Sequence, residues 1–270
     1  MQHLEAVVFD WAGTLIDFGS KAPMSAFVES FLEFGVHISV ADARGPMGMA
    51  KLDHIMAIGQ APHIAAQWTA AQGGVFDKAA AERIYAVFVP KNAEIITDYA
   101  DLIPGAIPTI QAIRAQGLKI GTTTGYTRDL MDRVLPLVKA QGFEPDSLIC
   151  AMETYAGRPS PAMMYQTFLN LQITASAHVV KVDDTEVGIL EGLSAGAWTV
   201  GIAGTGNVMG LSEAEFNALT PEERDDRLDE AREIVAAWGC DYVIDSVAEL
   251  MPVLEDIDEE LDALGDPDAD

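Results

Sequence analysis

Acidic residues follow two short apolar segments of this chain. Asp10 comes directly after residues 6–9, and Asp184 follows the segment 178–182. If these segments are neighbouring parallel strands, the two carboxylates converge at the edge of the sheet where open α/β folds bind ligands. Mg²⁺ is usually held by one or two carboxylates together with water and phosphate oxygens, so the pair forms a candidate magnesium site. Taken singly, Asp10 is equally consistent with a turn, and Asp184 or Thr185 with a helix N-cap.

A second set of residues has the chemistry to contact a phosphate group. Thr124 and Gly125 directly follow the apolar segment 118–123. Backbone N–H groups beside a glycine at this place can approach an anion. Arg158 lies in a loop before a predicted helix and can supply a cation, and Lys181 is the alternative. Alone, the glycine turn is a weak signal, and Arg158 is more typical of a surface loop.

Composition and charge exclude several classes of protein. The chain has 270 residues, 49% of them hydrophobic, with 23 Gly and 13 Pro, so it is neither disordered nor fibrous. Its 42 acidic and 16 basic residues give a net charge of −26, which argues against binding to nucleic acid or to an anionic membrane surface. An anionic substrate therefore needs a local cationic site.

The cysteine content and the N-terminus indicate the compartment. Two cysteines are too few for a disulfide framework, and no Cys or His cluster has zinc spacing. The N-terminus lacks the features of a signal peptide, and no apolar run is long enough to span a membrane. We therefore expect a soluble, cytoplasmic protein.

Apolar segments alternate with amphipathic ones along most of the chain. Helix-length stretches end at Gly117 and Gly142, where a glycine favours the left-handed C-cap conformation. This alternation predicts an α/β fold with a doubly wound parallel sheet, that is, a Rossmann-like core. The segments typical of buried parallel strands are residues 6–9, 118–123, 148–150, 178–182 and 198–201.

Residues 20–98 interrupt this alternation and show helical periodicity only. The first helix presents one apolar face and ends at Gly35; its face comprises Met24, Phe27, Val28, Phe31 and Leu32. Further helical patterns occur around residues 49–58, 63–71 and 79–89. We therefore predict a helical cap domain at 20–98, inserted into an α/β core domain formed by residues 1–19 and 99–270.

The C-terminal part is predicted to be helical and structural. Capping boxes at Ser212 and Thr220 each predict the start of a helix. Residues 255–270 are strongly acidic and are expected to form a solvated helix end and a frayed terminus.

The ordered residues Asp10, Thr124, Arg158 and Asp184 resemble the four motifs of the haloacid dehalogenase-like hydrolase superfamily. Within it, the sequence resembles the phosphonoacetaldehyde hydrolases (phosphonatases) from about residue 5 to 250. The resemblance implies hydrolysis of the C–P bond of phosphonoacetaldehyde to acetaldehyde and phosphate, in 2-aminoethylphosphonate degradation, by a homodimer. The segments that carry it are Val8-Phe9-Asp10-Trp11-Ala12-Gly13-Thr14, Pro46-Met47-Gly48, Lys51, His54, Thr123-Thr124-Gly125-Tyr126-Thr127-Arg128 and Ala156-Gly157-Arg158-Pro159.

The same resemblance implies roles for individual residues. Asp10 is the nucleophile that forms an aspartyl phosphate, and Lys51 forms a Schiff base with the aldehyde. Mg²⁺ is held by Asp10, the carbonyl of Ala12 and Asp184. The residues implied to contact the substrate or its phosphonate group are Thr124, Gly125, Arg158, Met47, His54 and Tyr126.

Ala12 and Lys51 both fit this chemistry. In phosphomonoesterases of the superfamily, the residue two places after the nucleophile is an acid that protonates the leaving group, but here it is Ala12. A C–P bond needs no such acid once an amine has condensed with the aldehyde, because the carbon then leaves as an enamine. Lys51 can supply that amine if burial lowers its pKa, and Met47 at i−4 and His54 at i+3 can share its helix face. From the pattern alone, Lys51 is more typical of a solvated helix surface.

Other interpretations stay open. One alternative is a haloacid dehalogenase, which also has an Asp nucleophile, lacks an acid two residues later and needs no metal. Another is a small-molecule phosphatase, which Ala12 disfavours. A non-catalytic binding protein on the same fold is disfavoured by Asp10, Lys51 and Asp184. The sequence departs from many superfamily members at Gly188, where an acid is common. Asp183 can compensate for it, and we expect Asp184 to be the direct metal ligand.

Overall fold

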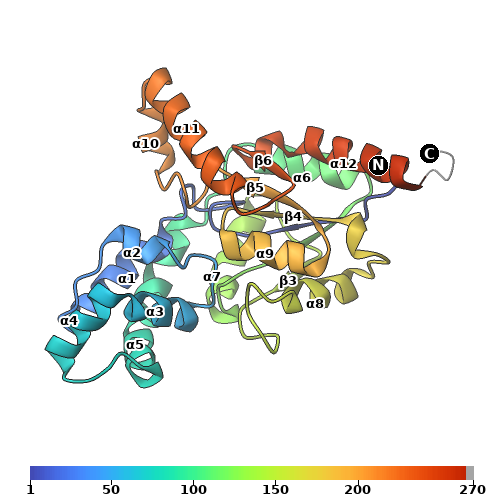
Figure 1. Cartoon of the computed structure of the whole chain (residues 1–270). Coiled ribbons are helices and arrows are strands. Elements are labelled where there is room, and N and C mark those ends of the chain that lie inside the picture. Colours follow the sequence, from blue (N-terminus) through green and yellow to red (C-terminus); the bar gives the residue numbers. More distant parts are fainter. Residues whose placement is uncertain (266–270) are drawn as a thin grey trace.

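Six parallel strands form one sheet, in the order β3-β2-β1-β4-β5-β6 (Figure 1). The structure is a computed structural model that describes residues 1–265. β1 pairs with β2 on one side and with β4 on the other, so the carboxyl ends of these three strands meet where the strand order reverses. The strands are β1 (Ala6–Phe9), β2 (Lys119–Thr123), β3 (Ser147–Ile149), β4 (Val179–Asp183), β5 (Trp198–Ile202) and β6 (Tyr242–Ile244).

Helices cover both faces of the sheet (Figure 1). Side chains of β1 alternate between the faces: Val7 and Phe9 belong to the core formed with α6, α7 and α12, whereas Ala6 and Val8 pack with α8 and α9. This architecture confirms the predicted fold class. The covering helices are α6 (Ala106–Ala115), α7 (Arg128–Ala140), α8 (Ala162–Leu171), α9 (Glu186–Ala195), α11 (Pro221–Ala236) and α12 (Leu250–Gly265).

A separate group of helices lies between β1 and β2 in the chain. This group, here called the helical region, has its own hydrophobic core, in which Phe27 stacks on Phe88 and Trp68 meets Phe76 edge to face. The sequence predicts a helical insertion at this place, while the bounds of the two domains stay a prediction. The helical region consists of α1 (Ala22–Leu32), α2 (Val40–Arg44), α3 (Lys51–Gln60), α4 (Pro62–Gln72) and α5 (Lys78–Ile95).

The C-terminal part agrees with the sequence except for one strand. Capping boxes at Ser212 and Thr220 start α10 (Glu213–Asn217) and α11, as predicted. β6, a strand of three residues, is missed by the sequence analysis. The predicted acidic helix end falls in α12, and the frayed terminus lies outside the described residues from position 266 on.

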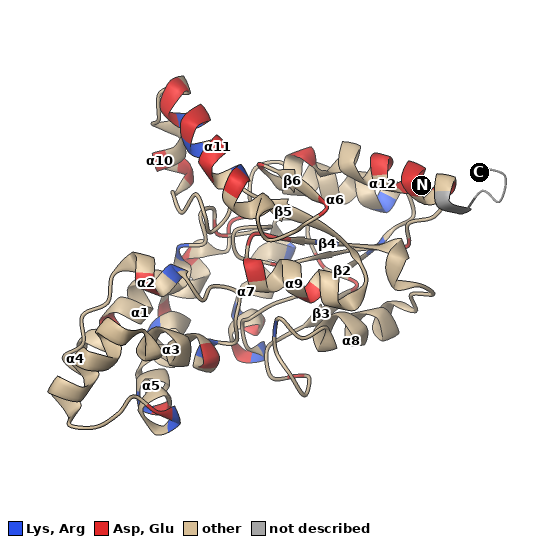
Figure 2. Ribbon diagram, viewed as in Figure 1, with Lys and Arg blue, Asp and Glu red and all other residues tan. Residues whose placement is uncertain are grey.

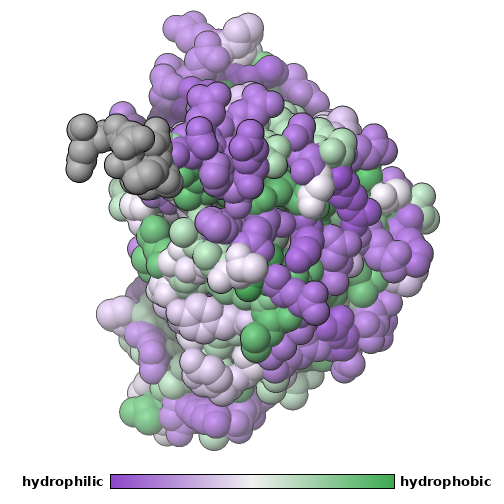
Figure 3. All heavy atoms as spheres, turned by 90° about the vertical axis from the view of Figure 1, so that its right-hand side faces the viewer, coloured by the Kyte–Doolittle hydropathy of each residue, from purple (hydrophilic) through white to green (hydrophobic). Residues whose placement is uncertain are grey.

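The surface of the molecule reflects its composition. Acidic side chains gather on α11 and α12 (Figure 2). On the face shown in Figure 3, hydrophilic side chains cover much of the coloured surface and apolar ones form smaller patches between them. Within residues 1–265, the structure contains no helix with the length and apolar character needed to cross a membrane.

Candidate active site

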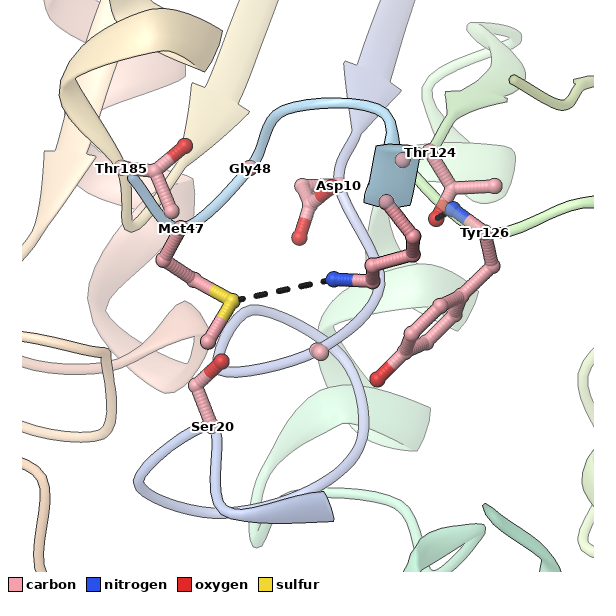
Figure 4. A pocket seen from close by; sticks show the side chains of 10 residues that line it. Asp10, Ser20, Met47, Gly48, Thr124, Tyr126 and Thr185 are labelled. Carbon is pink, nitrogen blue, oxygen red and sulfur yellow. Dashed lines mark hydrogen bonds between the residues drawn. The ribbon is translucent and has the colours of Figure 1, made fainter. Parts of the chain in front are cut away.

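A small cavity lies where the loops after β1, β2 and β4 meet the helical region. Its volume is about 20 Å³, which is enough for about one water molecule. Asp10 and Thr124 face it from the sheet side and Met47 from the helical region (Figure 4), and Lys51 of the helical region also lines it. The residues that line it are Asp10, Ala12, Ser20, Met47, Gly48, Lys51, Thr124, Gly125, Tyr126 and Thr185.

Asp10 follows β1 and is only 5% exposed. Arg158 donates a hydrogen bond from Nη1 to Oδ1 of Asp10 at 2.8 Å. Burial, and then the negative charge of Asp183, raise the pKa of Asp10 to about 6, although Arg158 and Lys181 oppose the shift. A buried carboxylate that is oriented by a guanidinium group and faces a cavity is suited to act as a nucleophile.

Three carboxylates form a buried cluster beside this cavity. Oxygen atoms of Asp10, Asp183 and Asp184 lie within 4.8 Å of one another. Asp183 is neutralised by cations, since its Oδ2 atom lies 3.0 Å from Nζ of Lys181 and 3.4 Å from Nη1 of Arg158. Burial alone would raise the pKa of Asp183, but these two positive charges lower it.

Asp184 has a different environment. Its oxygens accept hydrogen bonds from the Thr14 hydroxyl at 3.3 Å and from the backbone N–H of Asn207 at 2.7 Å. Burial and the charges of Asp10 and Asp183 raise the pKa of Asp184 well above its ordinary value. Because oxygen ligands with surplus negative charge suit a hard divalent cation, Asp184 and Asp10 fit a Mg²⁺ site better than Asp183 does.

The charge of the whole cluster also fits a divalent cation. Four buried acids are joined to the two buried cations that contact them directly, so this set, when fully ionised, has an excess of two negative charges; Lys51, also buried, forms no salt bridge with the set. One divalent cation would balance this excess. The acids are Asp10, Asp183, Asp184 and Glu191, and the cations are Arg158 and Lys181.

Two glycines make room for the acids. Gly13 has a φ of +84°, and a methyl group added there would overlap the carboxylate of Asp184. A methyl group added at Gly188 on α9 would overlap the carboxylate of Asp183. The Asp183 carboxylate thus fills the space in which a side chain at position 188 would begin. This packing explains why glycine, and not a further acid, stands at position 188.

Arg158 lies behind Asp10 and is not among the residues that line the cavity. Its Nε atom donates to Glu191 at 3.0 Å, and Nη2 donates to the carbonyl and the hydroxyl of Thr123, both at 2.8 Å. Lys181 is also fully buried and donates to the Thr123 hydroxyl at 2.8 Å. A contact between either cation and the phosphonate group stays a prediction, because the contacts observed here position acidic side chains.

Glu191 is a component of the site that the sequence analysis missed. It is fully buried, and its Oε2 atom lies 3.0 Å from Nε of Arg158 and 3.2 Å from Nζ of Lys181. Glu191 follows Gly188 by three residues, so the two lie on the same face of α9. The sequence signal for Glu191 was an acidic residue on the face of α9 that packs against the sheet.

Lys51 reaches the cavity from the first residue of α3 and is 5% exposed. Its Nζ atom lies 3.9 Å from Sδ of Met47 and 5.0 Å from the centre of the Tyr126 ring (Figure 4). Burial lowers the pKa of Lys51 to about 8, although nearby carboxylates, Asp10 first among them, raise it. The structure therefore contains a buried lysine here and not a solvated one.

Met47 reaches Lys51 from a turn and not from the same helix. The sequence predicts a helix around residues 49–58, but α3 begins at Lys51. Gly48 in the preceding turn has a φ of +88°, and a methyl group there would overlap the side chain of Thr185. The turn therefore delays the start of α3 and packs directly on the loop after β4, which brings Met47 and Lys51 close to the acidic cluster.

His54 lies one turn further along α3, is fully buried and is not among the cavity residues. Its Nε2 atom donates to the carbonyl of Ala43 at 2.7 Å, so Nδ1 is the unprotonated nitrogen. Nδ1 has no hydrogen-bond partner among the described residues. Burial and the positive charge of Lys51 lower the pKa of His54 well below its ordinary value, so a neutral imidazole lies beside Lys51.

Two buried hydroxyl groups face the cavity without a hydrogen-bond partner in the described part of the chain. They belong to Tyr126 and to Ser20, which the sequence analysis missed (Figure 4). Burial raises the pKa of Tyr126 well above its ordinary value, so its hydroxyl keeps its proton and can donate a hydrogen bond. Ser20 gives no signal in the sequence, because its position follows from a left-handed turn with a φ of +50°.

The loop after β2 completes the cavity wall. The hydroxyl of Thr124 accepts a hydrogen bond from the backbone N–H of Tyr126 at 3.1 Å. A methyl group added at Gly125 would lie 2.7 Å from the carbonyl oxygen of Met49. A glycine at this position therefore allows the helical region to approach the sheet closely.

Known proteins are similar to this chain in sequence and in fold. The family of haloacid dehalogenase-like hydrolases matches residues 4–196. The phosphonoacetaldehyde hydrolase of Paraburkholderia xenovorans (strain LB400) is 49% identical over 261 residues, which cover 97% of this chain and 98% of that protein. The phosphonoacetaldehyde hydrolase of Bordetella avium (strain 197N) is 44% identical over 96% of this chain and 92% of its own.

Solved structures agree with these sequence comparisons. The crystal structure of a phosphonoacetaldehyde hydrolase-like protein from Oleispira antarctica matches with a TM-score of 0.95 at 39% identity, covering 98% of this chain and 95% of that one. A β-phosphoglucomutase from Clostridium difficile, at 16% identity and a TM-score of 0.69 over 96% of this chain and 99% of its own, shares the fold.

Proposed function

Because this chain belongs to the phosphonoacetaldehyde hydrolases of the haloacid dehalogenase-like hydrolase superfamily, we propose that it hydrolyses phosphonoacetaldehyde to acetaldehyde and phosphate. The observation that carries the proposal is the cavity shared by Asp10 and Lys51, since this reaction needs both a nucleophile and a buried amine. Ala12 supports it, because an enamine leaves without the acid that an alkoxide requires. The reaction belongs, in this proposal, to the degradation of 2-aminoethylphosphonate.

In the first step, the neutral amine of Lys51 attacks the aldehyde carbon, and the adduct takes up one proton and loses water to leave an iminium ion. The lowered pKa of Lys51 makes the neutral form available near neutral pH. The hydroxyl groups of Tyr126 and Ser20 face the same cavity and can donate hydrogen bonds to the carbonyl oxygen as it leaves.

In the second step, Asp10 attacks phosphorus and the C–P bond breaks. The electron pair of that bond moves to the iminium group and forms an enamine, while phosphorus becomes part of an aspartyl phosphate. Arg158 donates to Oδ1 of Asp10 from the side away from the cavity, so it can hold the carboxylate in position for attack.

In the last steps, water hydrolyses the aspartyl phosphate and restores Asp10. Protonation of the enamine carbon returns the iminium ion, and a second water releases acetaldehyde and restores the Lys51 amine. The overall reaction consumes one water molecule, because the water lost in imine formation is returned.

We propose that Asp10, Asp184 and the carbonyl of Ala12 hold Mg²⁺. The support is the excess of two negative charges in the buried cluster, together with the position of Ala12 on the cavity wall. When bound, the ion would offset the negative charge of the phosphonate oxygens. The contribution of the chain is to hold the two acids close together.

We also propose that residues 20–98 form a cap domain that moves. The cavity of about 20 Å³ is too small for phosphonoacetaldehyde, so the cap must open to admit it.

We propose a homodimer, which light scattering would test. We propose a cytoplasmic location, because the free thiols of Cys150 and Cys240 are typical of a reducing compartment.

The first experiment measures the products. Purified protein is incubated with phosphonoacetaldehyde and MgCl₂, acetaldehyde is followed with alcohol dehydrogenase and NADH, and phosphate is measured in parallel, with and without EDTA. We expect equimolar acetaldehyde and phosphate that disappear with EDTA. Absence of acetaldehyde from folded protein, with release of phosphate from simple esters or of halide from halo acids, would overturn the proposal.

A further inference from the structure

Arg44 connects the helical region to loops of the sheet. It is the last residue of α2, and its guanidinium group is half-buried. Nη1 donates to the carbonyl of Gly19 at 2.9 Å and to Oδ1 of Asn207 at 3.1 Å, and Nη2 donates to the carbonyl of Gly210 at 3.1 Å. Arg44 thus joins three segments: α2, the crossing into the helical region, and the loop after β5.

Asn207 extends this connection to the acidic cluster. Its side-chain amide donates back to the carbonyl of Arg44 at 3.4 Å, and its backbone N–H donates to Oδ2 of Asp184 at 2.7 Å. At Gly210, which has a φ of +63°, a methyl group would lie 2.9 Å from Cζ of Arg44, so the guanidinium packs flat against this loop. A continuous path therefore runs from Arg44 through Asn207 to Asp184.

The charges around Arg44 favour this closed arrangement. Burial lowers the pKa of Arg44, whereas the negative charges of Asp17, Asp184 and Glu215 raise it. These three acids lie outside the helical region. The guanidinium is therefore attracted toward the sheet side of the molecule when the helical region is closed.

We propose that Arg44 is a positioning residue that couples closure of the helical region to metal binding. In the closed arrangement it fixes the loop that carries Asn207, and the backbone N–H of Asn207 then holds Asp184 in place for Mg²⁺. The inference rests on the proposed function, because it takes Asp184 as a metal ligand. Coupling is reciprocal, so Mg²⁺ favours closure by the same factor as closure favours Mg²⁺.

The test measures Mg²⁺ binding directly, by titration calorimetry of metal-free protein. The variants are Arg44→Ala, Asn207→Ala and the double substitution. Arg83→Ala is the matched control, because within residues 1–265 the Arg83 side chain bonds only to Gln72 and lies over Phe34 and Trp68, all in the helical region. We expect each single variant to raise the Kd for Mg²⁺ about tenfold, the double variant to add little, and the control to bind like wild type.

Two further readouts separate coupling from a loss of folding. Millimolar guanidinium should restore Mg²⁺ binding to Arg44→Ala, and Mg²⁺ should protect the helical region from proteolysis in wild type but not in that variant. If Arg44→Ala fails to fold, Arg44→Lys and Asn207→Ala carry the same test. Equal Kd values in wild type and variants would overturn the coupling alone. Absence of Mg²⁺ binding in wild type would overturn the proposed metal site and the coupling together.

Discussion

Arg158 and Asp10 form an ion pair at 2.8 Å, in which the two side chains are 1% and 7% exposed. The pair orients the carboxylate that follows β1, and Asp10, but not Arg158, lines the cavity. Lys51 enters the same cavity from α3. The two groups that the proposed reaction needs are thus supplied by the loop after β1 and by the helical region, and they meet at one cavity.

The pH dependence of the reaction should report the protonation of Lys51. With a pKa of about 8, about one Lys51 side chain in ten is neutral at pH 7, and the neutral fraction grows as the pH rises. Imine formation needs the neutral amine, so kcat/KM should rise with pH and level off above the pKa. We expect a midpoint near 8 in steady-state rates at saturating Mg²⁺. A midpoint near the ordinary lysine value would contradict the effect of burial.

Substitution by asparagine should separate the roles of the two adjacent acids. Asp184→Asn should weaken Mg²⁺ binding at least tenfold and should not lower stability, because Asp184 has surplus negative charge around it. Asp183→Asn should instead lower the free energy of unfolding by about 3 kcal/mol, because it leaves the charges of Lys181 and Arg158 poorly compensated. Calorimetry and urea unfolding measure the two effects. The opposite pattern would assign the metal to Asp183.

Glycine at position 188 should be required by the packing of Asp183. Gly188→Ala should displace that carboxylate, lower the free energy of unfolding by about 2 kcal/mol and reduce kcat. Gly74→Ala is the control, because nothing lies within 4 Å of a methyl group there. Urea unfolding of both variants measures the difference. Wild-type stability in Gly188→Ala would mean that Asp183 has room to move.

Removal of the Ser20 hydroxyl should affect activity but not stability. This hydroxyl has no partner among the described residues, so Ser20→Ala loses no hydrogen bond in the free protein. It should nevertheless lower kcat/KM about tenfold, through loss of one hydrogen bond to the reacting carbonyl group. Ser30→Ala is the control, since the buried Ser30 hydroxyl donates to the carbonyl of Ala26 and its loss should lower the melting temperature only. An unchanged kcat/KM in Ser20→Ala would exclude the contact.

Residues at strand ends could be predicted from the sequence, whereas contacts set by tertiary packing could not. The run before Asp10 is apolar on both faces and the run before Asp184 is rich in Val, so they identify buried strands and their carboxyl ends. The orientation of Arg158 depends on how a loop packs on the sheet, which no local pattern encodes, whereas Glu191 could have been found from its place on the buried face of α9. The burial of Lys51 contradicts its local pattern, and only the family resemblance pointed to it.

Trapping of the imine tests the central claim most directly. The protein is mixed with phosphonoacetaldehyde, reduced with sodium borohydride, digested and examined by mass spectrometry, with Lys51→Arg as the matched variant that keeps the charge but forms no imine. The account predicts irreversible inactivation that requires substrate and a reduced adduct on Lys51 alone. Full activity after reduction, an adduct on another lysine, or turnover by Lys51→Arg would contradict it.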